Sequence, residues 1–332
     1  MVVKYIRRAL ENAKSMAVRS RCVSQASKAV RRLSLCGATL RMPRRQGVRR
    51  LALLLLSLLV VTAATACEAL FSQEYPDGAA RCDRASRPDT ALRIALLGDS
   101  NTWNGGDSCT KSTSWSYWFR LAMQPCSCVS LARSGATWTH TVRTRRALTD
   151  YSERLADHNV VYNQVERLVS AVDSGRMLPP HLIIIMSGTN DAWFAARRPG
   201  IYALSVAEAF ALPADSLLSL PPSALTSLPL AVRYDCERLR LRFPDARLVL
   251  LTPYQSVHAG KSAIERVGSL VEECAHRLDI PVLRLDRAVP IRSDKEKVHH
   301  RLTTDGTHTS PEGARKAAEV IERFVRPLVF TD

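Results

Sequence analysis

Two short polar segments near opposite ends of the chain carry residues that could act together in nucleophilic chemistry. Ser100 stands in Gly-Asp-Ser-Asn directly after an apolar run, and a serine hydroxyl becomes a nucleophile when a neighbouring base takes its proton. His308 could be that base, because Asp305 precedes it by three residues and could orient its imidazole ring. The three side chains could therefore transfer an acyl group. The Gly-x-Ser-x-Gly motif of ordinary α/β-hydrolases is absent around Ser100.

Two further polar segments could assist this chemistry. Asn190 stands in Gly-Thr-Asn-Asp after another apolar run, and its amide could donate a hydrogen bond into the same site. Gly135, in Arg-Ser-Gly-Ala-Thr, would let a backbone N–H approach a ligand closely. Each segment by itself also fits an ordinary turn or helix cap. The occurrence of all four segments, in this order and next to predicted strands, favours one shared site.

These segments need a scaffold that brings strand ends together. Compact apolar runs predict five buried strands, at residues 92–97, 128–131, 182–186, 247–252 and 281–285. Helical patterns lie between or after them, at 114–123, 160–174, 231–242, 261–278 and 311–325. Alternating strands and helices predict parallel βαβ units in a three-layer α/β/α sandwich, whose sites lie at the carboxyl ends of the strands.

Residues 200–230 interrupt this alternation. They are rich in Leu, Ala, Ser and Pro. We interpret them as an insertion, either a lid beside the site or a plain surface excursion with short helices.

The polar segments together resemble the SGNH, or GDSL-type, hydrolases. Leu-Leu-Gly-Asp-Ser-Asn-Thr-Trp is similar to the family's first block, Arg-Ser-Gly-Ala-Thr to the second, Ser-Gly-Thr-Asn-Asp to the third and Asp-Gly-Thr-His-Thr-Ser-Pro-Glu-Gly to the last. The resemblance spans about residues 91–325. It implies a flavodoxin-like sandwich with a central parallel sheet of about five strands. It also implies a serine esterase that needs no metal or organic cofactor.

The resemblance assigns roles to individual residues. Ser100 would be the nucleophile and His308 the base, with Asp305 orienting the base. The oxyanion hole would consist of the Ser100 N–H, the Gly135 N–H and the Asn190 side chain. The family's fourth block is not clear in this chain, where residues 252–254 (Thr-Pro-Tyr) offer only a loose match. Substrate contacts therefore stay open.

Three tryptophans lie beside three of these blocks: Trp103, Trp138 and Trp193. Aromatic rims suit sugar faces, so the set favours a carbohydrate ester, although ordinary packing around a pocket would explain it equally well. We expect removal of acetyl groups from a carbohydrate or glycan. A lipase or thioesterase of the same fold is the enzymatic alternative, and a carbohydrate-binding module without catalysis is the other. The complete set of Ser100, Asn190, Asp305 and His308 disfavours the binding module.

The net charge of +16 suggests nucleic acid at first, but its distribution argues against that partner. Residues 1–50 hold 14 Lys and Arg and one acidic residue, hence +13, whereas the rest holds 33 basic and 30 acidic residues, hence +3. A surface that reads phosphates should lie on the folded domain. We therefore expect an ester substrate as the partner and no nucleic acid.

The basic region leads into an export signal. Residues 41–50 are cationic, and residues 51–66 form an apolar run that ends in small residues. The run is shorter than the about 20 residues of a membrane span, although an uncleaved signal remains an alternative. Cys67 follows directly and resembles a bacterial lipoprotein site, while Ala-Thr-Ala before it also suits ordinary cleavage. We expect an exported protein, either secreted or attached to the cell envelope by lipid on Cys67.

These patterns divide the chain into four parts. Residues 1–41 are interpreted as a mis-called extension, with Met42 as the true start. Residues 42–67 form the signal peptide, 68–90 a linker and 91–332 the hydrolase domain.

Six cysteines lie beyond the signal, and an even number in an exported domain allows up to three disulfides. They are Cys82, Cys109, Cys126, Cys128, Cys236 and Cys274. Proximity in the chain favours Cys109 with Cys126 or Cys128, and Cys236 with Cys274. Their spacing does not fit a usual zinc site, so no metal is expected.

Overall fold

The computed structural model describes residues 92–149 and 151–330. All of them belong to one of two compact units of the chain, Tyr75–Asp332. The predicted extension, signal peptide and linker (1–41, 42–67 and 68–90), with Cys67, lie outside the described residues, as does Cys82.

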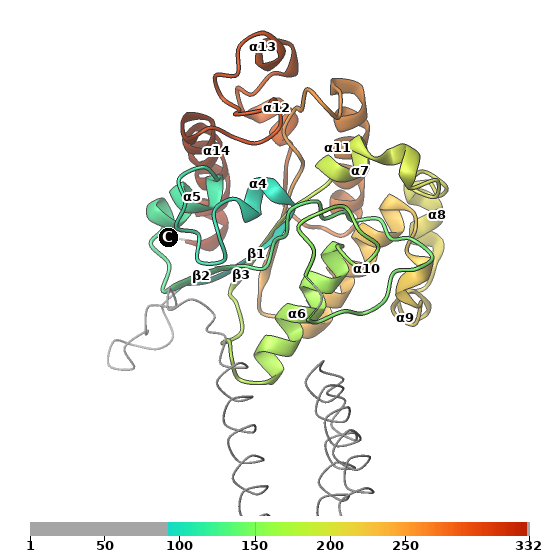
Figure 1. The fold of residues 1–332 in the computed structure, drawn as a ribbon. Helices are drawn as coiled ribbons and strands as arrows, with labels where there is room; N and C mark the ends of the chain where they lie inside the picture. The colour runs from blue at the N-terminus through green and yellow to red at the C-terminus, as the bar shows by residue number, and fades with distance from the viewer. Residues whose placement is uncertain (1–91, 150, 331–332) are drawn as a thin grey trace, which may run out of the picture. The chain divides into compact units, whose positions relative to one another are not determined.

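A parallel sheet with the order β2-β1-β3-β4-β5 forms the centre of the described unit (Figure 1). Its strands are β1 (Arg93–Gly98), β2 (Ser127–Ser130), β3 (Leu182–Met186), β4 (Arg247–Leu251) and β5 (Val282–Leu283). The register pairs Gly98 with Met186 and Met186 with Leu251. The carboxyl ends of the three central strands therefore lie side by side, and the residues that follow them share one edge of the sheet.

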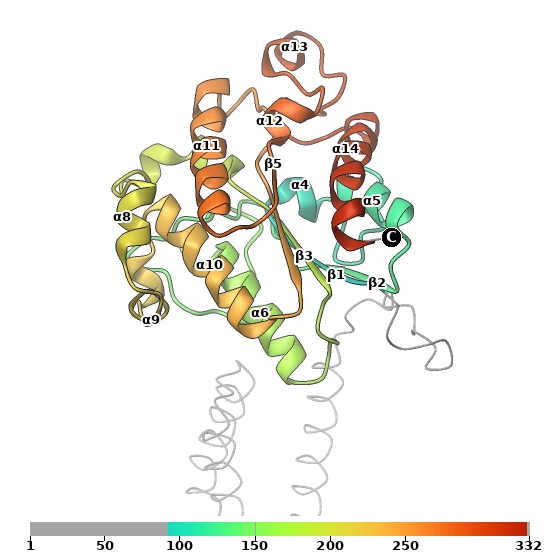
Figure 2. The ribbon, with the colours of Figure 1, turned by 180° about the vertical axis from the view of Figure 1, so that it is seen from behind.

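Helices cover both faces of the sheet, which explains why the strands are continuous apolar runs (Figures 1 and 2). On one face, Ala95, Leu97 and Ile183 pack with α6 (Val161–Asp173), α10 (Leu228–Arg242) and α11 (Lys261–Arg277). On the other face, Ile94, Leu96 and Ile184 pack with α5 (Trp115–Met123) and α14 (Pro311–Val329). This arrangement confirms the predicted three-layer α/β/α sandwich with a five-stranded parallel sheet.

The predicted elements are present, with ends displaced by a few residues. Helix α10 begins earlier than predicted because Pro229 is tolerated in the first helical turn. Strand β5 is shorter than predicted because Leu285 already belongs to the next helix, α12 (Leu285–Ala288). The remaining helices are short: α4 (Ser100–Trp103), α7 (Thr189–Trp193), α8 (Val206–Ala211), α9 (Ala214–Leu218) and α13 (Ser293–Val298), with 3₁₀ turns at Ala195–Arg197 and Pro222–Ala224.

Residues 200–230 form the excursion of short helices that was one of the two expectations. Helices α8 and α9 lie within it, and the side chains of Ala209, Leu217 and Leu225 are fully buried in the core. Arg233 of α10 donates hydrogen bonds of 2.7 Å to the carbonyl oxygens of Ala209 and Leu212. These contacts fasten the segment to α10.

Candidate active site

The end of β1 presents Ser100 at the carboxyl edge of the sheet. Gly98 has φ +145°, and a Cβ there would lie 2.0 Å from the carbonyl oxygen of Met186, so only glycine fits. Asp99 caps the helix that follows, because its carboxylate accepts a hydrogen bond from the Asn101 N–H at 3.0 Å. Ser100 is the first residue of this helix, α4, and its own N–H needs no acceptor within the helix.

His308 and Asp305 complete a chain of hydrogen bonds to this serine. His308 Nε2 lies 2.8 Å from Ser100 Oγ, and His308 Nδ1 lies 2.7 Å from Asp305 Oδ2. The other carboxylate oxygen of Asp305 accepts from the backbone N–H groups of Thr307 (2.9 Å) and His308 (2.8 Å). Partial burial opposes ionisation of Asp305, but these hydrogen bonds and the charge of His308 hold its pKa below the ordinary value. The carboxylate is therefore ionised and the ring orientation is fixed.

The loop after β2 carries Gly135 to the same edge. Gly135 has φ +77°, and a Cβ there would lie 2.6 Å from the backbone of Arg154 and Leu155. The Asn190 side chain, from α7 after β3, donates to the Ala136 carbonyl oxygen at 2.9 Å. An amide has two N–H donors, so the second remains for a ligand. The structure thus places Asn190 against the loop that contains Gly135, and within the described residues the Ser100 and Gly135 N–H groups have no acceptor.

The sequence pattern of the GDSL-like lipase/acylhydrolase family matches residues 96–316. The chain belongs to this family. Among solved structures, the native aryl esterase of M. smegmatis is 17% identical, covering 72% of this chain and 100% of its own, with a TM-score of 0.44. A possible lipase from Chitinophaga pinensis is 15% identical, covering 71% and 98%, with a TM-score of 0.46. No curated protein is significantly similar to the chain.

In this GDSL-like protein, the loop after β4 holds the segment Asp305–His308 in place. Gly306 has φ +84° and packs directly against the Val257 side chain. The loop also contains Thr252 and Tyr254, which match the family's fourth block only loosely and whose side chains are buried. Three hydrogen bonds join the two segments: from Val257 N to Gly306 O (2.8 Å), between Ser256 Oγ and Thr307 Oγ1 (2.8 Å), and between His258 Nε2 and Asp305 O (2.9 Å).

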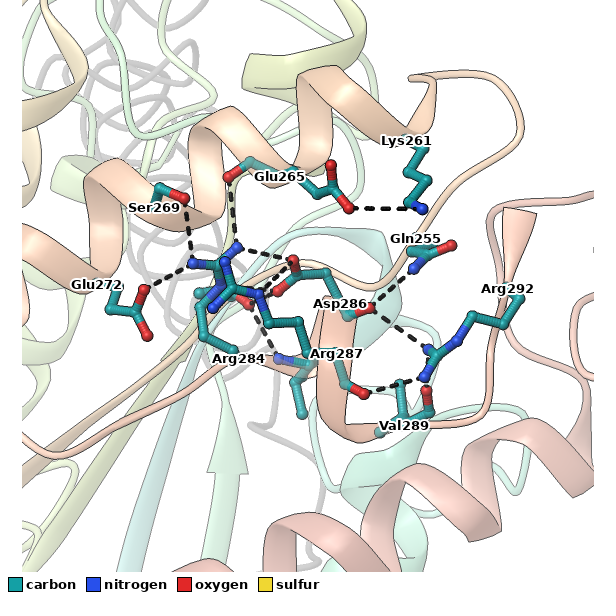
Figure 3. Close-up of polar contacts among 12 residues, drawn as sticks. Gln255, Lys261, Glu265, Ser269, Glu272, Arg284, Asp286, Arg287, Val289 and Arg292 are labelled. Atoms are coloured by element: carbon teal, nitrogen blue, oxygen red, sulfur yellow. Dashed lines mark hydrogen bonds and ion pairs between the residues drawn. The ribbon is translucent and has the colours of Figure 1, made fainter. Parts of the chain in front are cut away.

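A buried ion pair supports that loop in turn (Figure 3). The Arg284 guanidinium donates two hydrogen bonds of 2.8 Å to the Asp286 carboxylate, one to each oxygen, and one of 2.7 Å to Glu272 on α11. The Asp286 carboxylate accepts from the Thr252 hydroxyl at 3.1 Å, and its carbonyl oxygen accepts from the Gln255 amide at 3.0 Å. The network therefore joins α11, α12 and the start of the loop that contacts the histidine segment.

Asp99 is the second carboxyl group close to the serine. Its side chain is fully buried, and burial raises its pKa from 3.8 to about 6. The neighbouring Thr189 side chain, the hydrogen bond from the Asn101 N–H and the charge of His308 act in the opposite direction. Protonation of Asp99 is therefore coupled to folding and to the charge on the base.

The tryptophans differ from the expected aromatic rim. Trp138 is fully buried in the core beneath α6 and α10, so its proposed role in sugar contact is wrong. Trp103 is partly buried. Trp193 is 37% exposed and stacks on Phe194 and His258, with ring centroids 5.1 and 4.9 Å apart. Only Trp193 retains a substantially exposed indole next to the proposed site.

The predicted disulfide pairs are wrong for four of the six cysteines. Cys109, Cys128, Cys236 and Cys274 are free, buried thiols. The sulfur atoms of Cys109 and Cys128 are 3.8 Å apart, well beyond the about 2.05 Å of a disulfide. Cys236 and Cys274 lie in the core between α10 and α11, where burial raises the pKa of both thiols. Cys126 is disulfide-bonded, and none of these four is its partner.

Within residues 92–149 and 151–330, no cluster of three or more His, Cys, Asp or Glu side chains could hold a metal ion. None of the helices in these ranges is long and apolar enough to cross a membrane.

Sequence reasoning missed Asp191 as a residue that shapes the site. Its buried carboxylate accepts hydrogen bonds from the Trp138 N–H (2.9 Å), the Thr139 N–H (2.9 Å) and the Thr139 hydroxyl (2.7 Å). Asn190 and Asp191 therefore hold both ends of the short stretch that follows Gly135. The position of Asp191 directly after Asn190 was a signal, but an Asp there also fits an ordinary helix cap, and its partners 52 and 53 residues away leave no local pattern.

Proposed function

We propose that this GDSL-like protein is an exported serine esterase that hydrolyses its substrate through an acyl-enzyme. The observation that carries the proposal is the hydrogen-bonded chain from Ser100 Oγ through His308 to Asp305, with distances of 2.8 and 2.7 Å. This order places a base on the nucleophile and an anion on the base, which is what acyl transfer by serine requires. Export rests on the sequence pattern of residues 41–66.

The proposed reaction has two halves. Ser100 Oγ attacks the ester carbonyl carbon while His308 Nε2 accepts its proton, and Asp305 stabilises the resulting imidazolium. The Ser100 N–H, the Gly135 N–H and the free N–H of Asn190 would stabilise the negative oxygen, each donor contributing about 3 kcal/mol. His308 then returns the proton to the departing alcohol. Water attacks the acyl-enzyme in the second half, again with His308 as base, and releases the acid.

Hydrolysis of p-nitrophenyl acetate by the wild type and by Ser100→Ala tests this mechanism. We expect turnover by the wild type, background rates in the variant, and covalent labelling of Ser100 by a fluorophosphonate. Ser174→Ala is a matched control, because this exposed serine hydrogen-bonds only locally, to carbonyl oxygens at the end of α6 and with the Arg176 side chain two residues on. A folded wild type that is neither active nor labelled would indicate a binding protein on a hydrolase scaffold. Equal activity of wild type and Ser100→Ala would refute the nucleophile.

We further propose that the substrate is an acetylated carbohydrate or glycan. The support is narrower than the sequence suggested, because it now rests on the exposed indole of Trp193 and its stacking on His258. Acetate release from acetylated oligosaccharides should fall in Trp193→Ala while turnover of p-nitrophenyl acetate is retained. A kcat/KM that rises steadily with acyl chain length would instead favour a lipase or thioesterase.

The proposed attachment through a lipid on Cys67 is tested separately. Intact-mass measurement of membrane-associated protein should find an acylated N-terminal cysteine. A water-soluble mature protein without lipid would show secretion instead.

A further inference from the structure

The backbone of Gly98, two residues before Ser100, is hydrogen-bonded through both its N–H and its carbonyl oxygen to one buried side-chain amide. The Gly98 N–H donates to Gln164 Oε1 at 2.7 Å, and Gln164 Nε2 donates to the Gly98 carbonyl oxygen at 2.8 Å. Gln164 belongs to α6 and is fully buried, 66 residues away in the sequence. Both the oxygen and the nitrogen of the Gln164 amide thus hydrogen-bond to the same residue of β1.

This contact occurs where β1 extends beyond its last pair with β2. On one side, Gly98 pairs with Met186 of β3, and the Asp99 N–H donates to the Met186 carbonyl oxygen at 3.1 Å. On the other side, the last pair with β2 is Leu96 with Ser130, and beyond it the Arg133 N–H still donates to the Gly98 carbonyl oxygen at 3.1 Å. Gln164 therefore shares that carbonyl oxygen with Arg133 and alone supplies the acceptor for the Gly98 N–H.

Few side chains could do this. The contact needs a donor and an acceptor on one group, which a carboxamide supplies and an apolar or ionised side chain does not. Without the Gln164 amide, the buried Gly98 N–H would lose its acceptor, which would destabilise this end of β1.

We propose that Gln164 is a positioning residue that fixes the end of β1 and thereby places Ser100 Oγ within reach of His308. The inference rests on the proposed function of Ser100 as nucleophile. Gln164 contacts neither the Ser100 side chain nor His308, so it acts through the backbone at Gly98. Its loss should lower kcat and leave KM nearly unchanged, since a misplacement of the reacting atom by about 1 Å can reduce the rate by about 100-fold.

Gln164→Glu separates positioning from simple loss of stability. A protonated carboxyl has one donor and one acceptor and can reproduce both hydrogen bonds, whereas an ionised carboxylate repels the Gly98 carbonyl oxygen. A buried glutamate titrates at raised pH, in the range of about 5 to 9. The ratio of kcat in the variant to kcat in the wild type should therefore be near one at acid pH and fall by about 10-fold to 100-fold as pH rises.

Groups that titrate in both proteins change the two kcat values equally, so their effect cancels in the ratio of kcat in Gln164→Glu to kcat in the wild type. Three charged groups lie near the contact between Gln164 and Gly98. Asp99 follows Gly98 directly, and His308 is hydrogen-bonded to Ser100. The third is Arg133, whose backbone N–H also donates to the Gly98 carbonyl oxygen at 3.1 Å. All three are present in wild type and variant. Active-site titration with a fluorophosphonate at each pH gives the number of folded, competent sites, so that kcat is expressed per site.

Asn163→Asp is the matched control, because it makes the same chemical change in the adjacent buried residue of α6. Asn163 donates to the carbonyl oxygens of Arg145 (3.1 Å) and His158 (2.7 Å) and does not contact β1. We expect it to lose stability without a comparable pH-dependent change in the kcat ratio per site. Gln164→Leu should have a low kcat at every pH with KM unchanged, which keeps the test valid if the glutamate variant unfolds.

The outcomes separate the two proposals. A wild type that shows neither turnover nor labelling of Ser100 overturns the proposed function and this inference together. An active wild type with a flat ratio for Gln164→Glu, or with a full kcat in Gln164→Leu, overturns the positioning role alone. A shift confined to KM would also overturn it.

Discussion

Replacing Asp99 by Asn should remove a large pH dependence from the stability of the fold. Asp99 is fully buried, and burial raises its pKa from 3.8 to about 6 against the opposing effects of Thr189, the Asn101 N–H and the charge of His308. The folded protein therefore binds this proton more tightly than the unfolded chain does. The resulting stability is fully present below the unfolded pKa and is lost as pH rises through about 6.

The magnitude follows from the difference between the two pKa values. A shift from 3.8 to about 6 is a little over two units, and each unit corresponds to 1.36 kcal/mol, so the contribution is ~3 kcal/mol. At neutral pH the wild type is therefore less stable by this amount than at acid pH, because the carboxyl group is harder to ionise when buried in the fold than in the unfolded chain. Asparagine cannot ionise, so Asp99→Asn lacks the term at every pH.

Urea unfolding of wild type and Asp99→Asn, followed by tryptophan fluorescence at about pH 4 and about pH 8, measures the effect. We expect the variant to gain ~2 kcal/mol relative to the wild type between the two conditions, because pH 4 already lies just above the unfolded pKa of 3.8 and part of the contribution is lost there. The exposed Asp215→Asn is the control for loss of one carboxylate from the surface. A stability difference between wild type and Asp99→Asn that is the same at both pH values would refute the reasoning.

Four other outcomes are expected. Asn190→Ala should reduce kcat by about 100-fold to 1,000-fold on a nitrophenyl ester, because it removes an oxyanion donor; an unchanged kcat would exclude that role. Arg284→Ala should lower the free energy of unfolding by about 3 to 5 kcal/mol, because it leaves the Asp286 carboxylate buried without its partner. Arg287→Ala should cost about 0 to 1 kcal/mol, since Arg287 is 61% exposed and 4.0 Å from that carboxylate, and equal losses in urea unfolding would contradict the comparison. The four buried thiols should react with a maleimide only after denaturation, as mass spectrometry would show; labelling of the native protein would contradict their burial.

The centre of the sheet could be predicted from the sequence because β1, β3 and β4 are buried on both faces along nearly their whole length. The run at 182–186 is apolar at every position, and the structure forms β3 over the same residues. The predicted strand at 281–285 was too long, since apolar composition does not distinguish a short buried strand from the first turn of a buried helix. Element type was therefore more predictable than element length.

The prediction for Trp138 and the predicted cysteine pairs failed for a different reason. Position beside a segment that resembles a family block does not tell whether a side chain points into the core or to the surface, and Trp138 points into the core. Closeness in the chain likewise does not set the direction of a Cβ, so Cys109 and Cys128 approach each other without bonding. Both questions depend on packing between elements that are distant in the sequence.

The sequence by itself determined what depends on neighbouring residues: the apolar runs that become strands, the glycine at the end of β1, and the three-residue spacing that lets Asp305 hold the His308 ring. Only the tertiary structure decided which of these meet. Ser100 and His308 are 208 residues apart, and they touch because the ends of β1 and β4 share one edge of the sheet, where the loop after β4 holds the segment that contains His308. The glutamine that holds Gly98 had no local signal at all, because a hydrogen bond across 66 residues leaves no pattern in the residues around it.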